Sequence, residues 1–365
     1  NYNSAGTSNN GLVIGDFSGL GTPEILLLGQ GSGSGTNTIV TRSDSTPADT
    51  LIAVTNGSNA RWDVAYRPMT DSAIYVRESG AVYPLVDLIS PHWLVSSLSY
   101  SSGTGATNSE TFRYAGNKVH VGGRGPLGFH IFERTAPGGD GTPITTWTTM
   151  SQSYPFVGLP TEVRRFVQSQ GDQSWLRLST SIYEDMMATT TCWATVPQTS
   201  PKTPALFMPV LTRNSEQSRD LNQAPLTTIT TTNSNFTCAA DPGQVAVVTT
   251  PSAEPTQVFS KTTVNQYLAP NISGDNWIIG KLSRATQTNS VPAKLGLTNL
   301  GGTLTASRSS AFEYSTTTGQ LSAEVIEPDN PAICVRTSYG RDSFGNRSSK
   351  TVANCSGATG DAVFA

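Results

Sequence analysis

A predicted hairpin turn between two cysteines is the feature of this sequence that most constrains its fold. Residues 339–347 read YGRDSFGNR and separate two strand-like segments. Gly345 supplies the positive φ that a tight turn needs, and Asp342 can cap the turn with its side chain. Tyr339 and Asn346 lie on either side of the turn. The unit contains no catalytic group, so the function of a chain built from such hairpins depends on what they assemble into.

The rest of the sequence has the pattern of an all-β protein. Thr, Ser, Gly and Asn dominate, and short alternating runs are separated by Gly, Asn, Asp and Pro. Residues 175–183 place Leu176, Leu178 and Ile182 on one face, which predicts a strand with one buried face. Residues 244–249 are apolar on both faces, which predicts a strand covered on both sides. We therefore expect antiparallel, hairpin-rich sheets.

Length and charge exclude several classes of protein. The chain has 365 residues, enough for two or three packed units. Its net charge is −3 and only 13% of residues are charged, so no basic stripe can neutralise nucleic-acid phosphates. No apolar run reaches the roughly 18 residues that cross a bilayer, and no signal peptide precedes Asn1. We expect a soluble chain, either mature or excised from something longer, without a nucleic-acid partner or membrane span.

The chain holds four cysteines: Cys192, Cys238, Cys334 and Cys355. An even count with few charges and many hydroxyls suits an oxidising, extracellular compartment. A two-residue loop at residues 344–345 would place Cys334 and Cys355 directly opposite, whereas a type I turn with a bulge at Gly345 would offset them by one residue. A disulfide fits the first register and needs local adjustment in the second. The other two cysteines then pair by elimination; the alternative is four buried free thiols.

A Gly-rich acidic loop near the start of the chain, residues 15–24 (GDFSGLGTPE), precedes an apolar run. It resembles an FG-GAP, or VCBS, repeat, whose loop leads into a propeller strand and holds Ca²⁺ through oxygens at positions one, three, five and nine. Those positions are Asp16, Ser18, Leu20 and Glu24 here. Because leucine offers no side-chain oxygen, the resemblance implies either a weak calcium site at the other three or a turn that lost the ion. A single copy indicates the end of a propeller that began upstream.

Further segments resemble large Rhs proteins and the B-type components of insecticidal toxin complexes (TcB- or SpvB-like proteins). In the family's order these segments are residues 51–57, 64–71, 74–75, 111–116, 123–129, 154–158 and 276–282. Tyr114 and Gly125 are the strand tyrosine and the turn glycine of this pattern. Residues 311–321 resemble a degenerate YD repeat, the hairpin unit of these families, through Tyr314 and Gly319, and the turn at 339–347 resembles a second unit.

The resemblance divides the chain into four segments. Residues 1–50 are VCBS- or FG-GAP-like, 51–185 resemble the TcB middle region, 186–270 are a weakly matched β region, and 271–365 are YD-repeat-like hairpins. It implies a propeller-like start and a shell-like end, since in the family such sheets spiral into a hollow shell around a toxic polypeptide, and the propeller docks to a partner.

Catalytic motifs are not evident. His92, His120 and His130 lie apart in the sequence without a zinc-binding spacing, and no Gly-x-Ser-x-Gly elbow supplies a nucleophile. A glycosidase needs only two neighbouring carboxylates, whose proximity a sequence does not show, so a polysaccharide-active enzyme is the third hypothesis. Six tryptophans could bind a glycan, although a sheet core explains them equally.

We therefore expect a non-enzymatic structural module of a secreted or cell-surface assembly of the Rhs or toxin-complex kind, serving as a scaffold or shell segment. The alternative is a secreted β-rich adhesin or self-assembling fibre subunit. In either case, protein partners or further copies would bind through sheet edges, including residues 25–28 and the hairpin from Cys334 to Cys355. A glycan is a second candidate ligand, and calcium is the single candidate cofactor.

Overall fold

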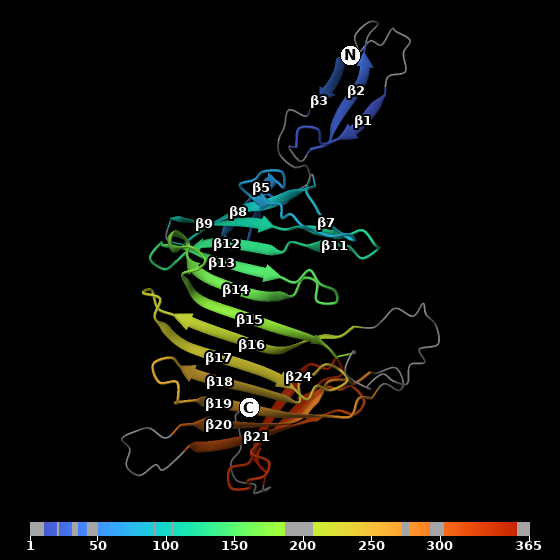
Figure 1. Ribbon diagram of the computed structural model, residues 1–365. Coiled ribbons are helices and arrows are strands. Elements are labelled where there is room, and N and C mark those ends of the chain that lie inside the picture. The colour runs from blue at the N-terminus through green and yellow to red at the C-terminus, as the bar shows by residue number, and fades with distance from the viewer. Residues whose placement is uncertain are drawn as a thin grey trace. The chain divides into compact units, whose positions relative to one another are not determined.

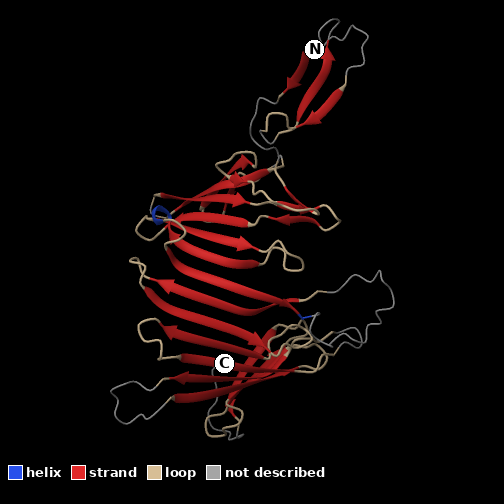
Figure 2. Ribbon diagram, viewed as in Figure 1, coloured by secondary structure: helices blue, strands red, loops and turns tan. Residues whose placement is uncertain are grey.

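The computed structural model describes residues 11–19, 22–30, 36–41, 50–90, 92–103, 105–186, 207–271, 277–292 and 303–355. Strands form nearly all of the regular structure (Figure 2), and η1 (Gln168–Gln170) is a short 3-10 turn. The predicted all-β fold is therefore confirmed. The chain forms two compact units, residues 1–178 and 179–365. The predicted division into four segments stays a prediction. Within the described residues, no helix is long and apolar enough to span a membrane.

A small antiparallel sheet begins the first unit, in the order β1 (Leu12–Gly15), β2 (Glu24–Gln30) and β3 (Thr36–Val40) (blue in Figure 1). Ile25 in β2 pairs with Ile14 on one side and Val40 on the other. The prediction that residues 25–28 form a free sheet edge is therefore wrong, because their strand lies in the middle of the sheet. Many apolar side chains of this sheet, Ile14 among them, are exposed.

The main sheet of the first unit is antiparallel, in the order β4 (Ala53–Thr55), β5 (Arg61–Pro68), β8 (Trp93–Ser101), β9 (Thr107–Ala115), β12 (Ile131–Pro137), β13 (Pro143–Met150) and β14 (Pro160–Val167). The short β6 (Tyr75–Val76) pairs with β9 in parallel. A second small sheet has the order β11 (Gly125–Gly128), β10 (Lys118–His120) and β7 (Leu85–Asp87). Short turns connect most of these strands, as expected for hairpin-rich architecture.

An aromatic cluster forms the core of the first unit. Met69 and Tyr75 are buried there, and Tyr114 and Phe129 pack against them. The Tyr114 and Phe129 ring centroids lie 4.9 Å apart, and the Tyr114 hydroxyl donates a hydrogen bond of 3.1 Å to the Val95 carbonyl. Burial raises the pKa of Tyr114. The motif tyrosine of this segment is thus a core residue whose polar end is satisfied.

The second unit is built on one antiparallel sheet in which each strand pairs with the next along the chain (Figure 1). Its order is β16 (Pro209–Arg219), β17 (Pro225–Ser234), β18 (Gln244–Pro251), β19 (Phe259–Tyr267), β20 (Leu282–Val291), β21 (Leu304–Tyr314), β22 (Leu321–Ile326), β23 (Val335–Arg341) and β24 (Arg347–Asn354). The boundary between the two units falls within β15 (Trp175–Asp185).

Both faces of this sheet carry polar side chains. On one face, Thr262 pairs with Thr288, which pairs with Ser307, and the Thr288 and Ser307 hydroxyl oxygens lie 2.9 Å apart. On the other face, Lys261 pairs with Asn289. All of β18 is only half-buried. The prediction that residues 244–249 form a strand covered on both sides is therefore wrong, because this sheet leaves both faces of β18 partly open to solvent.

Candidate functional site

The turn that joins β23 and β24 has the chemistry expected of it. The Asp342 carboxylate accepts hydrogen bonds of 2.9 Å from the backbone N–H groups of Phe344 and Asn346, and one of 3.1 Å from the Asn346 side chain. Gly345 has a φ of 87°, which disfavours any residue with a Cβ. The Asn346 side chain and the turn N–H groups hold the pKa of Asp342 below its ordinary value. The side-chain cap therefore persists at neutral pH.

The register of this hairpin brings Cys334 and Cys355 together. Next to the turn, the pairing of the two strands is offset by one residue. Asp342 donates its N–H to the Asn346 carbonyl, and Arg341 pairs with Arg347. A bulge then shifts the register, so that Gly340 pairs with Ser349. The two cysteines lie directly opposite, joined by a disulfide with a Cα–Cα distance of 5.4 Å. This is the second of the two predicted registers, with the local adjustment it required.

Cys192 and Leu20 lie outside the described residues, so the pairing of Cys192 with Cys238 stays a prediction.

Side chains from this turn link neighbouring hairpins. The Arg347 guanidinium lies 4.1 Å from the centre of the Tyr339 ring, a cation–π contact. Arg341 donates one hydrogen bond of 2.7 Å to the Gly345 carbonyl and another of 3.0 Å to the Leu321 carbonyl on β22. One guanidinium therefore holds the turn and the preceding strand pair at the same time.

The preceding turn, between β21 and β22, uses related chemistry. Ser315 occupies the aspartate position, and its hydroxyl accepts a hydrogen bond of 3.2 Å from the Thr318 N–H. Gly319 has a φ of 66°, and the Tyr314 hydroxyl donates 3.0 Å to the Leu282 carbonyl on β20. The β21–β22 and β23–β24 turns thus share a side-chain cap and a left-handed glycine.

Replacing Asp342 by alanine is expected to open the β23–β24 turn without unfolding the sheet. The Phe344 and Asn346 amides would lose their acceptor, so their hydrogen exchange is expected to accelerate on the order of tenfold, measured by NMR. Asp342→Asn, which keeps an acceptor oxygen, should retain most protection. Because the pKa of Asp342 is lowered in the fold, protection should be present at neutral pH and fade as the pH falls through that lowered pKa. Equal exchange in the wild-type and alanine chains would contradict the cap.

The predicted calcium loop is closed by its own glutamate. Glu24 is 1% exposed, and its Oε2 accepts hydrogen bonds from the N–H groups of Phe17 (2.9 Å) and Ser18 (2.7 Å). Its Oε1 is buried and has no hydrogen-bond partner among the residues that the structure describes. The described residues contain no group of three or more His, Cys, Asp or Glu that could hold a metal ion. Asp16 and Glu24 alone fall short of the six to eight oxygens that Ca²⁺ prefers, so calcium stays a prediction.

No sequence pattern predicted the two ion-pair networks of the first unit. Glu78 contacts Lys118 Nζ and His130 Nδ1, each at 2.6 Å. Burial alone would raise the pKa of Glu78, but the hydrogen bonds from Lys118 and His130 outweigh it and lower that pKa. Glu110 binds Arg134 through two hydrogen bonds. These partners are 24 to 52 residues apart, so no local spacing could have revealed them.

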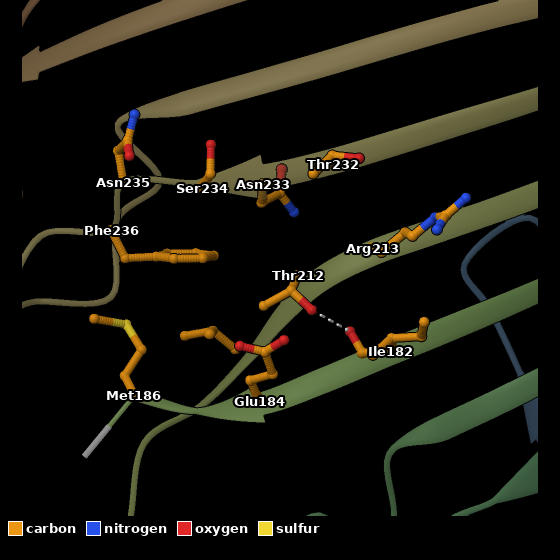
Figure 3. Close-up of a pocket in the computed structure, with 11 residues that line it drawn as sticks. Ile182, Glu184, Met186, Thr212, Arg213, Thr232, Asn233, Ser234, Asn235 and Phe236 are labelled. Carbon is orange, nitrogen blue, oxygen red and sulfur yellow. Dashed lines mark hydrogen bonds between the residues drawn. The ribbon is translucent and has the colours of Figure 1, made fainter. Parts of the chain in front are cut away.

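A groove lies beside the ends of β15, β16 and β17 in the second unit (Figure 3). Its volume is about 610 Å³, and its lining combines apolar side chains with the charged Glu184 and Arg213. Ile182, predicted on the buried face of its strand, is 53% exposed and lines this groove. That prediction is wrong because the apolar face of β15 ends in an open groove.

Comparison with known proteins shows which families and solved structures this chain is similar to. Residues 1–154 match the family described as insecticide toxin TcdB middle/N-terminal region. The solved structure of TcdB2-TccC3-TEV shares the fold with a TM-score of 0.63 at 9% identity, covering 94% of this chain and 23% of that one. TcdB2-TccC3 without the hypervariable C-terminal region gives 0.60 at 9% identity, covering 91% and 20%. No curated protein matches the chain.

The chain therefore spans about a fifth to a quarter of the length of those solved chains. The sequence match covers the first unit up to residue 154, whereas the structural match extends over nearly the whole chain. Together they confirm the predicted resemblance: this chain is similar to the B-type region of insecticidal toxin complexes.

Proposed function

We propose that the chain is a non-catalytic structural module of a secreted toxin-complex-like assembly, and that the sheet of its second unit is a segment of an enclosing wall. The polar character of both faces of this sheet carries the proposal. A sheet that covers a core buries one apolar face. A single-layered wall between two aqueous spaces instead needs two hydrated faces, as the rows through Thr288 and Lys261 provide.

The linkage between hairpins supports the same role. Each strand from β16 to β24 pairs with the next, and Arg341 ties the last turn to β22. Such a sheet can be lengthened hairpin by hairpin, because each unit makes the same kind of contact with the one before it. We propose that a second polypeptide adds to this wall, by analogy with the pairing named in the TcdB2-TccC3 structures.

Removal of the β23–β24 hairpin tests this role. Truncation after residue 333 is expected to abolish self-assembly or capture of a TccC3-type partner, while the rest of the chain stays folded by circular dichroism. Light scattering of the native species, alongside intact mass spectrometry, measures the assembly. Phe344→Ser, at an 89% exposed turn tip, is the control and should assemble normally. Unchanged assembly after truncation would contradict the proposal.

A secreted adhesin is the second candidate. It is favoured by single aromatic side chains that project into solvent, including Trp277 and Tyr83, at 70% and 82% exposure. Exposed aromatic rings are the side chains on which sugar rings stack. A native monomer that binds a glycan array, and loses binding on Trp277→Ala, would favour this candidate over the wall segment.

A further inference from the structure

We propose that the groove beside β15, β16 and β17 binds an extended segment of a partner polypeptide, in which one apolar residue lies between a basic and an acidic residue. The inference concerns a docking site rather than the wall itself, and it does not depend on whether the sheet encloses anything. It is carried by the shape, floor and charges of the groove (Figure 3).

The floor of the groove is apolar and preformed. Met186 and Val210 are 5% and 7% exposed, and Phe236 is half-buried beside them. In Figure 3 the Phe236 ring, the Met186 thioether and the Glu184 carboxylate lie around one space. The volume of about 610 Å³ falls in the range of ligand-binding pockets. A leucine, methionine or aromatic side chain would cover the apolar surface of the groove that is still in contact with water, chiefly that of Ile182, which is 53% exposed, and of the half-buried Phe236.

Backbone and side-chain hydrogen bonds hold the walls in place. The Thr212 hydroxyl donates 3.2 Å to the Ile182 carbonyl, which joins β16 to β15 (Figure 3). The Asn233 side chain donates 2.9 Å to the Leu211 carbonyl, which joins β17 to β16. Asn235 has a φ of 54°, and this left-handed residue turns the chain so that Phe236 faces the groove. A partner would therefore meet an ordered site, which reduces the entropy lost on binding.

Two side chains of opposite charge line the groove. The Glu184 carboxylate lies on the same side of the groove lining as Met186 and Phe236, whereas the Arg213 side chain extends away from them (Figure 3). Neither forms an ion pair or side-chain hydrogen bond with the part of the chain that the structure describes. The adjacent carboxylate, Asp185, is used elsewhere, since it accepts the Met208 N–H at 2.8 Å. A basic residue near Glu184 and an acidic one near Arg213 would complement both ends.

These features favour a peptide over other ligands. A sugar would leave the exposed apolar surface of Ile182 and Phe236 without an apolar partner, and a fatty acid could pair with Arg213 but not with Glu184. An extended peptide offers an apolar side chain between two opposite charges. It also offers backbone groups that can bond with Ser234 and Asn235 at the rim.

Fluorescence anisotropy with two labelled peptides tests the proposal on the full chain. One peptide carries lysine, leucine and glutamate in the proposed order, and the other has lysine and glutamate exchanged. We expect the two peptides to differ in affinity by roughly tenfold, the effect of one well-placed charge pair. Glu184→Lys with Arg213→Glu should reverse that preference, since both side chains are exposed and their exchange should leave the fold intact.

Glu254→Lys, an exposed position on the turn between β18 and β19, reverses one carboxylate away from the groove, as Glu184→Lys does within it, and should leave the preference unaltered. Three results would overturn the proposal: equal or absent binding of both peptides to a folded chain, no reversal in the exchanged variant, or the same effect from Glu254→Lys. Binding that emerges only when residues 187–206 are deleted would also overturn it, by assigning the groove to the chain itself.

Discussion

Replacing Cys334 and Cys355 together by alanine is expected to destabilise the last hairpin by about 3 kcal/mol, the value for a disulfide that closes a loop of this length. The bond joins residues 21 positions apart and closes the open end of the β23–β24 strand pair, opposite the turn. Cys334 is also buried, so its removal adds a small packing loss. Among changes to the second unit, we expect this one to have the largest effect on stability.

The measurement is native-state hydrogen exchange of the β23 and β24 amides, because unfolding of the two units need not be one transition. Protection of residues 335–341 and 347–354 should fall sharply in the double alanine variant, while protection of β16 to β20 stays close to wild type. Ser349→Ala, on the same hairpin, is the matched control. Equal protection in both variants would show that the strand pairing alone holds the hairpin.

Local turn chemistry is the part of this fold that the sequence predicts well. Asp342 and Gly345 define their turn within four residues, so a short segment was enough to predict a hairpin. The strand register was harder to predict, because it depends on the bulge opposite Gly340, where the two strands pack closely. A Cβ at Gly340 would meet the Ser349 hydroxyl oxygen, a contact that no turn rule contains. Both registers therefore stayed open until the strand pairing was known.

Alternation predicts which side chains share a face, but not whether anything covers that face. The run in β18 suggested a strand covered on both sides, yet the strand is half-buried throughout. Residues 25–28 were predicted to form a sheet edge, because no local sequence pattern indicates that β1 and β3 flank their strand. Layering and strand order depend on residues far apart in the chain, as do the partners of Glu78, which lie 40 and 52 residues away. These features could not be predicted from short segments.

Replacing Arg134 by methionine is expected to destabilise the first unit by about 2 kcal/mol at pH 7. Glu110 is 7% exposed and accepts two hydrogen bonds from Arg134, at 2.6 and 2.7 Å, and one of 3.2 Å from the Tyr100 hydroxyl. Without the guanidinium, a buried carboxylate would keep only the tyrosine. Breaking a fully buried pair costs about 3–5 kcal/mol. We expect less because the Arg134 side chain is 46% exposed and its charge is partly screened by solvent.

The effect should depend on pH in a defined direction. The hydrogen bonds from Arg134 outweigh burial and hold the pKa of Glu110 below its ordinary value. A carboxyl whose folded pKa is depressed contributes stability above its unfolded pKa, near 4.3, and that stability disappears as the pH falls through the folded pKa. In the methionine variant only the Tyr100 hydrogen bond still opposes the effect of burial on the pKa of Glu110, so its Glu110 should take up a proton at higher pH. The difference between the two chains should therefore be largest at neutral pH and shrink in acid.

Hydrogen exchange of the β9 and β12 amides between pH 7 and pH 4, corrected for the intrinsic pH dependence of exchange, isolates this unit from the second. Combining Arg134→Met with Glu110→Gln removes the buried charge together with its partner, and should recover most of the lost protection. A loss that is the same at every pH, or that the double variant retains, would mean that Arg134 acts through packing of its aliphatic stem against the sheet rather than through the ion pair. The double variant thus separates the charge of Arg134 from its volume, which the single substitution changes together.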